Sequence, residues 1–178
     1  MTARDLPTLS LDLRIHLRLA VREDLPKLEW YGQYTHYRTL FRRAFREQQL
    51  GRRLMLVADC NGFPIGQLFM QLHSADREIA DGVERVYLYA FRVMEMFRGH
   101  GIGTALMEEA EALALERGFR WATIAVAKEN HDARRLYERL GYRIFKDDPG
   151  QWRYRDHEGR MQWVNEPCWM MEKELLLH

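Results

Sequence analysis

The sequence Arg98-Gly99-His100-Gly101-Ile102-Gly103-Thr104 decides the fold, because an apolar run precedes it and a helix-like run follows it. Its three glycines at alternate positions let the backbone approach a ligand closely. The helix that begins behind them offers unpaired N–H groups and a partial positive charge. This combination predicts a cradle for an anion, most naturally a phosphate group.

Two common phosphate-binding motifs do not fit this loop. A dinucleotide fingerprint, counted from the first or the second glycine, meets Thr104 or Leu106 where glycine or alanine is required. A Walker loop requires a lysine, and the loop contains none. The spacing of Arg98, Gly101 and Gly103 instead resembles the Arg/Gln-x-x-Gly-x-Gly/Ala signature of the GNAT acyl-CoA-dependent N-acetyltransferases.

A second block lies downstream at the distance that the same family leads one to expect. Residues 121–127, Trp-Ala-Thr-Ile-Ala-Val-Ala, read as a buried strand. The residues from Asn130 to Tyr142 then resemble the family block Asn-x-x-Ala-x-x-Leu/Phe-Tyr-x-x-x-Gly-Phe/Tyr. The two blocks together cover about a third of the chain and identify it as similar to this superfamily.

The resemblance implies an α/β (mixed α+β) GNAT fold. Such a fold has a central, mostly antiparallel, twisted sheet of about seven strands, splayed between strands 4 and 5 and flanked by four helices. The chain departs from the plain pattern by an added C-terminal β-hairpin at residues 148–166. We expect a single domain over residues 1–178, with a loose N-terminal arm at residues 1–13.

The order of elements along the chain agrees with this fold: strand, two helices, three antiparallel strands, helix, strand, helix, strand. Asn61-Gly62 predicts a hairpin turn between two strands, and Gly118 predicts the end of the helix after the glycine loop. The other expected strands lie at 14–20, 54–58 and 65–72, with a central strand from near 84 and a last strand at 168–176. The other expected helices are a short one that begins at 23–26, one at 35–50 and one at 102–117.

Composition excludes several classes of protein. The 178 residues carry 27 Lys and Arg against 26 Asp and Glu, so a net charge of +1 gives no global field for nucleic acid or a membrane surface. No signal core or membrane span is evident, which makes a cytoplasmic protein the default expectation. Cys60 and Cys168 are read as free thiols, and the seven histidines lack metal spacing, so no metal is assigned.

The resemblance assigns cofactor contacts to both blocks. Phe91 and Val93 would bond the pantetheine and the thioester carbonyl through their main chain, and Asn130 would contact the pantetheine arm while it caps its helix. Tyr137 occupies the family position of the acid that protonates the leaving thiolate, and it also contacts the cofactor. The pyrophosphate would be held by Arg98, Gly99, His100, Gly101, Ile102, Gly103 and Thr104.

The acceptor amine must lose a proton, because an ammonium with a pKa near 10.4 is under ~0.1% neutral at pH 7. Glu84, near the start of the central strand, is the candidate base. A surface carboxylate at a hairpin end explains Glu84 equally well, and Asp76, Glu78 and Asp81 crowd the same loop.

Three groups of side chains have more than one reading. Arginines on and after the helix at 35–50 are favoured as a solvated face, with a patch that steers an acidic acceptor or the CoA phosphates as the alternative. The aromatic residues before that helix fit an acceptor pocket or plain core. The hairpin side chains fit an acceptor groove, a homodimer contact or a satellite core. The three groups are Arg38, Arg42, Arg43, Arg46, Arg52 and Arg53; Trp30, Tyr31, Tyr34 and Tyr37; and Trp152, Tyr154, Met161 and Trp163.

The function implied is an N-acetyltransferase that moves an acetyl group from acetyl-CoA, its acyl-donor co-substrate, directly to a primary amine of a small molecule or peptide. The competing class is a non-catalytic acyl-CoA-binding sensor or regulatory module. The acceptor, the acyl chain length and the oligomeric state stay open at this point.

Overall fold

The computed structural model describes residues 4–176. Within them seven strands form a central sheet in the order β1-β2-β3-β4-β5-β9-β6. Neighbouring strands run antiparallel except for β4 and β5, which run parallel. The strands are β1 (Ile15–Leu19), β2 (Arg53–Cys60), β3 (Phe63–Gln71), β4 (Arg85–Val93), β5 (Trp121–Ala127), β6 (Arg143–Asp148) and β9 (Cys168–Glu174).

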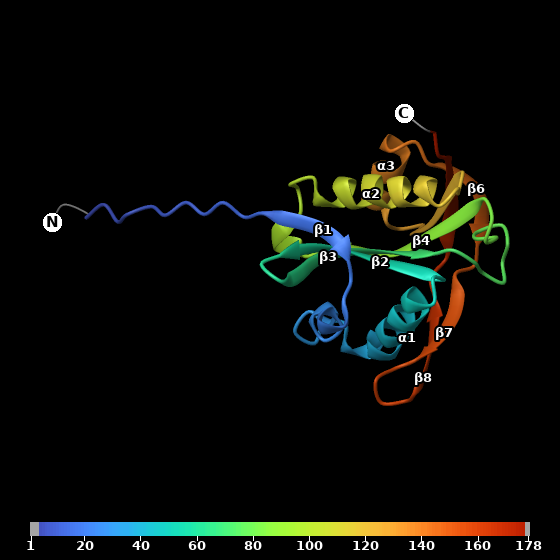
Figure 1. The fold of residues 1–178 in the computed structure, drawn as a ribbon, viewed down its shortest axis with the longest axis horizontal. Coiled ribbons are helices and arrows are strands. Elements are labelled where there is room, and N and C mark those ends of the chain that lie inside the picture. The colour runs from blue at the N-terminus through green and yellow to red at the C-terminus, as the bar shows by residue number, and fades with distance from the viewer. Residues whose placement is uncertain (1–3, 177–178) are drawn as a thin grey trace.

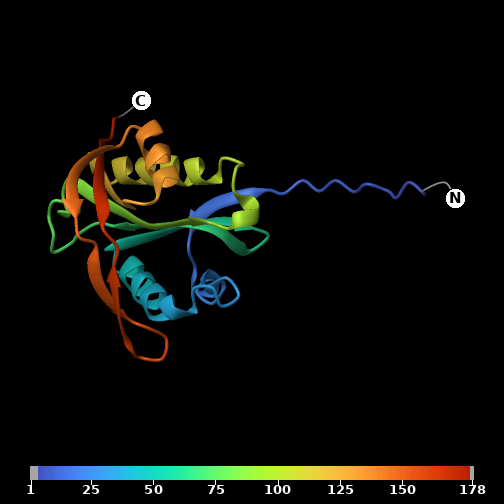
Figure 2. The same ribbon diagram turned by 180° about the vertical axis from the view of Figure 1, so that it is seen from behind.

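Helices cover both faces of this sheet (Figure 1). α2 (Ile102–Glu116) and α3 (His131–Arg139) lie on one face, and α1 (Arg38–Gln49) lies on the other, as the view from behind also shows (Figure 2). Each face has its own apolar core, the larger one under α2 and the smaller one under α1. The mixed α/β fold predicted from the sequence is therefore confirmed.

The α2 helix is fixed by its inward stripe and by its end. Leu106 and Met107 are fully buried against the sheet, which contributes about 2 kcal/mol for each side chain. The helix ends as predicted at Gly118, whose φ of +86° suits glycine, and the amide of Phe119 closes the end by donating to the carbonyl of Ala114 (3.0 Å).

The chain between β1 and α1 is more irregular than the sequence indicates. Instead of a short α-helix from residue 23, it forms the 3₁₀ turns η1 (Arg22–Asp24) and η2 (Lys27–Glu29), and η3 (Thr35–Tyr37) leads into α1. The buried Asp24 explains the first turn, because its carboxylate accepts hydrogen bonds from the amide of Val21 (2.8 Å) and from Arg18 of β1 (2.7 Å). These bonds tie the turn to the sheet and leave little room for a longer helix.

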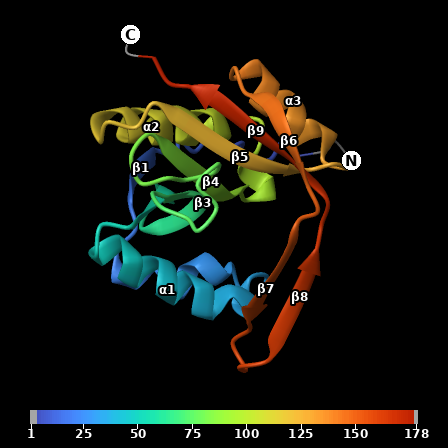
Figure 3. The same ribbon diagram turned by 90° about the vertical axis from the view of Figure 1, so that its right-hand side faces the viewer.

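Both predicted hairpins are present. Asn61 and Gly62 have φ angles of +51° and +84° and join β2 to β3, as the Asn-Gly pair predicts. The added C-terminal hairpin consists of β7 (Gln151–Arg155) and β8 (Met161–Asn165). It extends from the end of β6 to the level of α1 (Figure 3), where the ring of Tyr154 packs on that of Tyr37 (5.1 Å between centroids).

The last strand, β9, lies between β5 and β6, so β6 forms the edge of the sheet. Residues 4–14, which make up most of the expected arm, have no regular structure and extend away from the sheet (Figure 1). Residues 1–3 of that arm are outside the described part. Among residues 4–176, no helix is long and apolar enough to cross a membrane.

Candidate active site

The central feature of the site is an opening between β4 and β5. The two strands pair from Arg85 with Trp121 to Leu88 with Ile124, and there their pairing stops. β4 remains paired with β3 as far as Val93, and β5 remains paired with β9 as far as Ala127. The facing edges of residues 89–93 and 125–127 are therefore open to a ligand that can form main-chain hydrogen bonds.

A bulge at Ala90 turns β4 at the start of this opening. Ala90 has a φ of +52°, which costs a non-glycine residue about 1 kcal/mol, and the side-chain amide of Gln67 donates to its carbonyl (3.0 Å). Beyond the bulge, Phe91 and Val93 face Gly103 of α2, while Arg92 lies against Tyr34 on the α1 side. The bulge thus directs successive side chains to opposite faces of the opening.

The main chain of Phe91 and Val93 points toward the opening. The amide of Met94 donates to Ile65 of β3 (2.8 Å), so the alternation of a strand directs the peptide groups of residues 93 and 91 to the other edge. The carbonyl of Val93 accepts a hydrogen bond from Arg98 Nε (2.9 Å), which ties the glycine loop to the end of β4.

The glycine loop leads from β4 to the first turn of α2. After η4 (Glu95–Phe97), Gly99 and Gly101 have φ angles of +77° and +81°, and a Cβ at either position would meet no atom within 4 Å. The first bond of the helix runs from Ala105 to the carbonyl of Gly101, so the amides of residues 102–104 have no intrahelical acceptor. Three aligned donors behind an open loop fit a pyrophosphate group.

The second sequence block brings Tyr137 to the same strand. Its ring lies 6.3 Å from that of Phe91, and the residue is 5% exposed. Burial raises the pKa of Tyr137, so the phenol keeps its proton at neutral pH. Asn130 caps α3 as predicted, because its Oδ1 accepts from the amide of Ala133 (3.1 Å).

The structure does not bring Glu84 into this group. Glu84 is exposed and comes before β4, where its carbonyl accepts the amides of Arg120 and Trp121 (2.8 and 2.9 Å). Phe91 is seven residues further on, or about 23 Å along an extended strand. The side chain of Glu84 is also absent from the residues that line the cavity below the opening.

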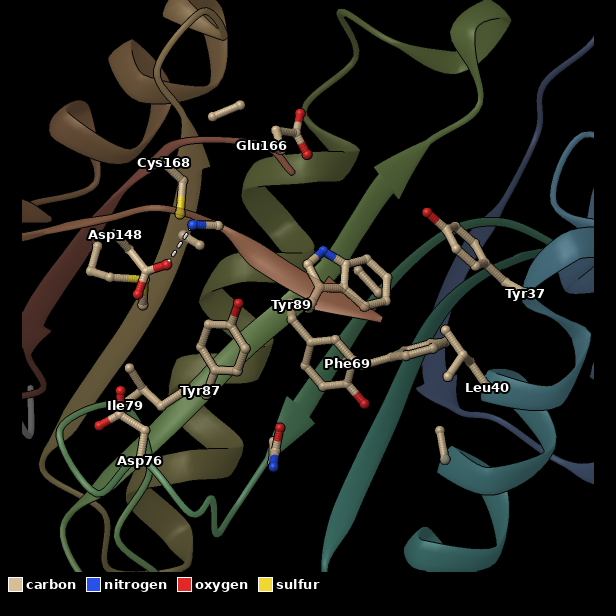
Figure 4. A pocket seen from close by; sticks show the side chains of 18 of the residues that line it. Tyr37, Leu40, Phe69, Asp76, Ile79, Tyr87, Tyr89, Asp148, Glu166 and Cys168 are labelled. Carbon is tan, nitrogen blue, oxygen red and sulfur yellow. Dashed lines mark hydrogen bonds between the residues drawn. The ribbon is translucent and has the colours of Figure 1, made fainter. Parts of the chain in front are cut away.

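A cavity of about 600 Å³ adjoins the opening on its α1 side. This volume is within the usual range for small-molecule sites. Figure 4 shows Tyr37 and Leu40 on one side, Asp148 and Cys168 on the other, Tyr87 and Tyr89 between them, and Glu166 at the top. Its lining residues are Tyr37, Leu40, Phe41, Arg43, Ala44, Arg53, Phe69, Gln71, Asp76, Ile79, Tyr87, Tyr89, Ala90, Arg92, Ala125, Ala127, Asp148, Gly150, Gln151, Trp152, Glu166, Cys168 and Met170.

The surroundings of Tyr87, Tyr89 and Cys168 in this cavity favour the neutral forms of their side chains. Burial raises the pKa of Tyr87 and of Tyr89, although Arg53 donates a hydrogen bond to the Tyr89 hydroxyl (2.6 Å). Burial, together with the nearby carboxylate of Asp148, raises the pKa of the Cys168 thiol. A thiol kept protonated is a poor nucleophile, which agrees with the reading of Cys168 as a free thiol without a covalent role.

The aromatic side chains for which the sequence allows several interpretations are divided in the structure between the cavity, the core and the surface. Tyr37 and Trp152 line the cavity, as the acceptor-pocket reading predicts. Trp30 belongs to the core, where its indole N–H donates to the carbonyl of Pro64 (2.9 Å). Tyr31 and Trp163 are mostly exposed.

Sequence reasoning missed Arg92 and Asp148, which both line the cavity. The sequence contains a signal that could have indicated Arg92, because it is the one charged residue in the otherwise apolar and aromatic run 88–93. It contains none for Asp148, since its position depends on the pairing of the end of β6 with Cys168 of β9. In the described part of the chain, no three His, Cys, Asp or Glu side chains gather as a metal site would require.

Comparison with known proteins identifies the family. Residues 20–142 match the Acetyltransferase (GNAT) family, and this match covers more than half of the chain. The chain therefore belongs to the GNAT acetyltransferase family, as the two sequence blocks predicted. An uncharacterized N-acetyltransferase of Archaeoglobus fulgidus is 49% identical over 83 residues, which are 47% of this chain and 55% of that protein. The chain spans between 22% and 55% of the length of the curated relatives that it matches.

Solved structures confirm the fold. Ard1 from Thermoplasma volcanium superposes with a TM-score of 0.69 at 20% identity, over 92% of this chain and 99% of that one. Arabidopsis thaliana NAA60 in complex with acetyl-CoA gives a TM-score of 0.68 at 20% identity, over 91% of this chain and 99% of that one. At this level of identity the similarity establishes the arrangement of strands and helices.

Proposed function

We propose that this protein transfers an acetyl group from acetyl-CoA directly to an amine that enters the cavity on the α1 side. The observation that supports this most is the opening between β4 and β5, because it ends at the unpaired amides of α2 and adjoins the cavity. A thioester laid along the opening would meet an acceptor from the other side. NAA60, which has the same arrangement of strands, was crystallised with acetyl-CoA.

In this proposal the glycine loop and the edge of β4 hold the donor. The amides of Ile102, Gly103 and Thr104 bind the pyrophosphate, with the backbone of residues 98–101 around it. The main chain of Phe91 and Val93 bonds the pantetheine in the manner of a missing strand. Asn130 contacts the same arm from the start of α3.

The transfer needs an acid and an oxyanion site. The amine nitrogen bonds to the thioester carbonyl carbon as the carbon–sulfur bond breaks, and main-chain N–H groups beside the Ala90 bulge stabilise the charge on the oxygen. Tyr137, which burial keeps protonated, donates a proton to the leaving thiolate. Cys168 forms no acyl-enzyme, because its thiol stays neutral.

The amine also has to lose a proton, and the cavity carboxylates are better placed for this than Glu84. Asp148 is half-buried in the lining, and no ion pair to it is present among residues 4–176. Its Oδ1 accepts the amide of Gly150 (2.7 Å), which Figure 4 shows as a dashed line. Asp148, directly or through water, is therefore our candidate base, and such a base contributes roughly 10²–10⁴-fold to the rate.

Calorimetry with acetyl-CoA and a CoA-release assay test the proposal. We expect binding of acetyl-CoA, and release of CoA with at least one amine from a panel of amino acids, polyamines, aminoglycosides and lysine peptides. Asp148→Asn should lower the rate much more than Glu84→Gln. Absence of any heat with acetyl-CoA would remove the proposal, and binding without CoA release from any amine would favour a sensor or regulatory module.

A further inference from the structure

Arg92 is a half-buried cation that has no ion-pair partner among residues 4–176. Its guanidinium carbon lies 4.0 Å from the ring centroid of Tyr34 and 5.2 Å from that of Tyr37, so the group is packed against two aromatic faces. Its Nη1 atom is buried and has no hydrogen-bond partner within residues 4–176. The side chain also lines the cavity. A charge removed from water in this way is costly, and the two rings offset only part of the cost.

The other two arginines that line the cavity each have an ion-pair partner. Arg43 and Arg53 both pair with the carboxylate of Glu47, Arg43 at 3.1 Å, and Arg53 also donates to Tyr89. No salt bridge to Arg92 exists in the described part of the chain, and burial lowers the pKa of Arg92 without making arginine neutral at physiological pH. Among the described residues, Arg92 is therefore the arginine of the cavity lining that has no ion-pair partner and that could bind an anionic group of a ligand.

We propose that Arg92 binds a carboxylate of the acceptor, so that the substrate is a small molecule with both an amine and a carboxylate, such as an amino acid. This inference rests on the proposed function, in which the cavity receives the acceptor. A guanidinium presents parallel N–H donors that match the two oxygens of a carboxylate, and Nη1 supplies an unused donor for this purpose.

The opposite wall of the cavity carries the complementary charge. Asp148 and Glu166 line it and have no ion pair among the described residues, whereas Asp76 pairs with Lys146 (3.5 Å). Arg92 packs against Tyr37, which Figure 4 shows on the side of the cavity opposite Asp148, so a molecule with its carboxylate at Arg92 would extend its ammonium group toward Asp148. The two walls thus match the two charges of an amino acid.

Between the charged walls the lining is largely apolar and aromatic. It includes Leu40, Phe41, Phe69, Ile79, Trp152 and Met170. A cavity of about 600 Å³ with this lining favours amino acids with apolar or aromatic side chains.

The anions of acetyl-CoA do not account for Arg92. The donors that fit a pyrophosphate are at the start of α2, on the face of β4 to which Phe91 and Val93 point. Arg92 points to the opposite face, against Tyr34 and Tyr37. The thioester end of the donor is uncharged, so the missing anion belongs to the acceptor.

The test compares each amino acid with its own α-amide. Leucine, methionine, phenylalanine and tryptophan, and the four matching amides, are assayed for CoA release at saturating acetyl-CoA and for binding by calorimetry with CoA present. We expect kcat/KM to be about 10–100-fold higher for the acids, as the loss of one charged hydrogen-bonded contact predicts. The amides have the less basic amines, so intrinsic reactivity at neutral pH would give the opposite order.

Two variants and one control assign the effect to Arg92. Arg92→Gln should remove the preference for the acid, and Arg92→Lys should keep part of it. Arg46→Gln, the same change at an exposed position of α1 outside the cavity lining, should leave the preference intact. Melting temperatures show whether each variant is folded. The comparison of acids with amides in the unmodified protein tests the proposal even if a variant does not fold.

The outcomes separate this inference from the proposed function. If acetyl-CoA binds and amines are acetylated, but acids and amides react and bind alike, the proposed role of Arg92 is wrong. The proposed acetyltransferase activity is then still supported. The same holds if Arg92→Gln slows acids and amides equally, because Arg92 would then act on the donor. If neither acids nor amides bind or react, the inference is wrong as well.

Discussion

The Cζ atom of Phe91 lies 3.1 Å from the position that a Cβ atom on Gly103 would take. Glycine at this position lets the first turn of α2 approach the splayed segment of β4. The proposed donor site uses the amides of that turn and the main chain of that segment, so this contact sets their separation.

Gly103→Ala should therefore weaken acetyl-CoA binding, because the ring of Phe91 has to shift by a few tenths of an ångström beside the segment of β4 that holds the donor. Phe91→Leu introduced into the Gly103→Ala variant should restore most of the affinity, since the smaller side chain removes the clash. Calorimetry on the two single variants and the double variant gives the coupling. Purely additive effects would show that the contact does not determine the donor site.

Gly101→Ala tests the role of the glycine loop in acetyl-CoA binding without introducing a steric clash. Gly101 and Gly159 both have a φ of +81°, and a Cβ at either position would meet nothing within 4 Å, so alanine strains both turns by a similar amount of about 1–2 kcal/mol. The two variants should lose similar stability. We expect only Gly101→Ala to weaken acetyl-CoA binding, and equal affinities in the two variants would argue against a pyrophosphate at this loop.

Tyr137→Phe removes the proposed acid and little else. The rate of CoA release should fall by roughly 10²–10⁴-fold while the affinity for acetyl-CoA changes little. Tyr142→Phe is the matched control, because the Tyr142 hydroxyl donates to Glu111 of α2 (2.9 Å) and neither residue lines the cavity. It should cost about 1–2 kcal/mol of stability and leave the rate unchanged. Similar rates in the two variants would contradict the role of Tyr137.

The turn of the β7–β8 hairpin should be sensitive to acid. Burial disfavours the charged form of Asp156, but hydrogen bonds from Gln162 and from the amides of Arg160 and Glu158 outweigh it and lower the pKa of Asp156 to about 2. A pKa below the ordinary 3.8 means that the carboxylate stabilises the folded chain above pH 3.8 and loses this effect as the pH falls toward about 2.

Asp156→Asn should therefore lower the melting temperature at pH 7, and the difference from the unmodified chain should shrink between about pH 4 and pH 2. Thermal melts followed by tryptophan fluorescence report this, because Trp152 and Trp163 belong to the hairpin. Asp12→Asn, in the arm, serves as the control. A difference that stays constant with pH would contradict the assignment.

The local features of the site follow from the sequence because short-range geometry determines them. The turn at Asn61-Gly62, the positive φ angles of Gly99 and Gly101 and the end of α2 at Gly118 each depend on a few neighbouring residues. Each of the two motif blocks likewise consists of residues that are close together in the sequence. Their joint spacing is sufficient to identify the family, and the family implies the order of the elements along the chain.

Features that depend on distant contacts could not be read in this way. Arg92 packs against Tyr34 and Tyr37, which lie more than 50 residues earlier in the chain, and nothing near residue 92 in the sequence reveals this contact. Asp148 lines the cavity because it ends β6, where it pairs with Cys168 of β9, a residue that is 20 positions further along the chain. The sequence places Glu84 near the start of the central strand, but the length of β4 separates it from Phe91 and Val93 at the opening.

The position of β9 has a consequence for biosynthesis. β9 lies between β5 and β6, so a nascent polypeptide that has not yet released residues 168–174 exposes the unpaired edges of both strands. Such edges are templates for intermolecular pairing and aggregation. Synthesis that stalls before Cys168 should therefore yield insoluble material, although both motif blocks would already be complete.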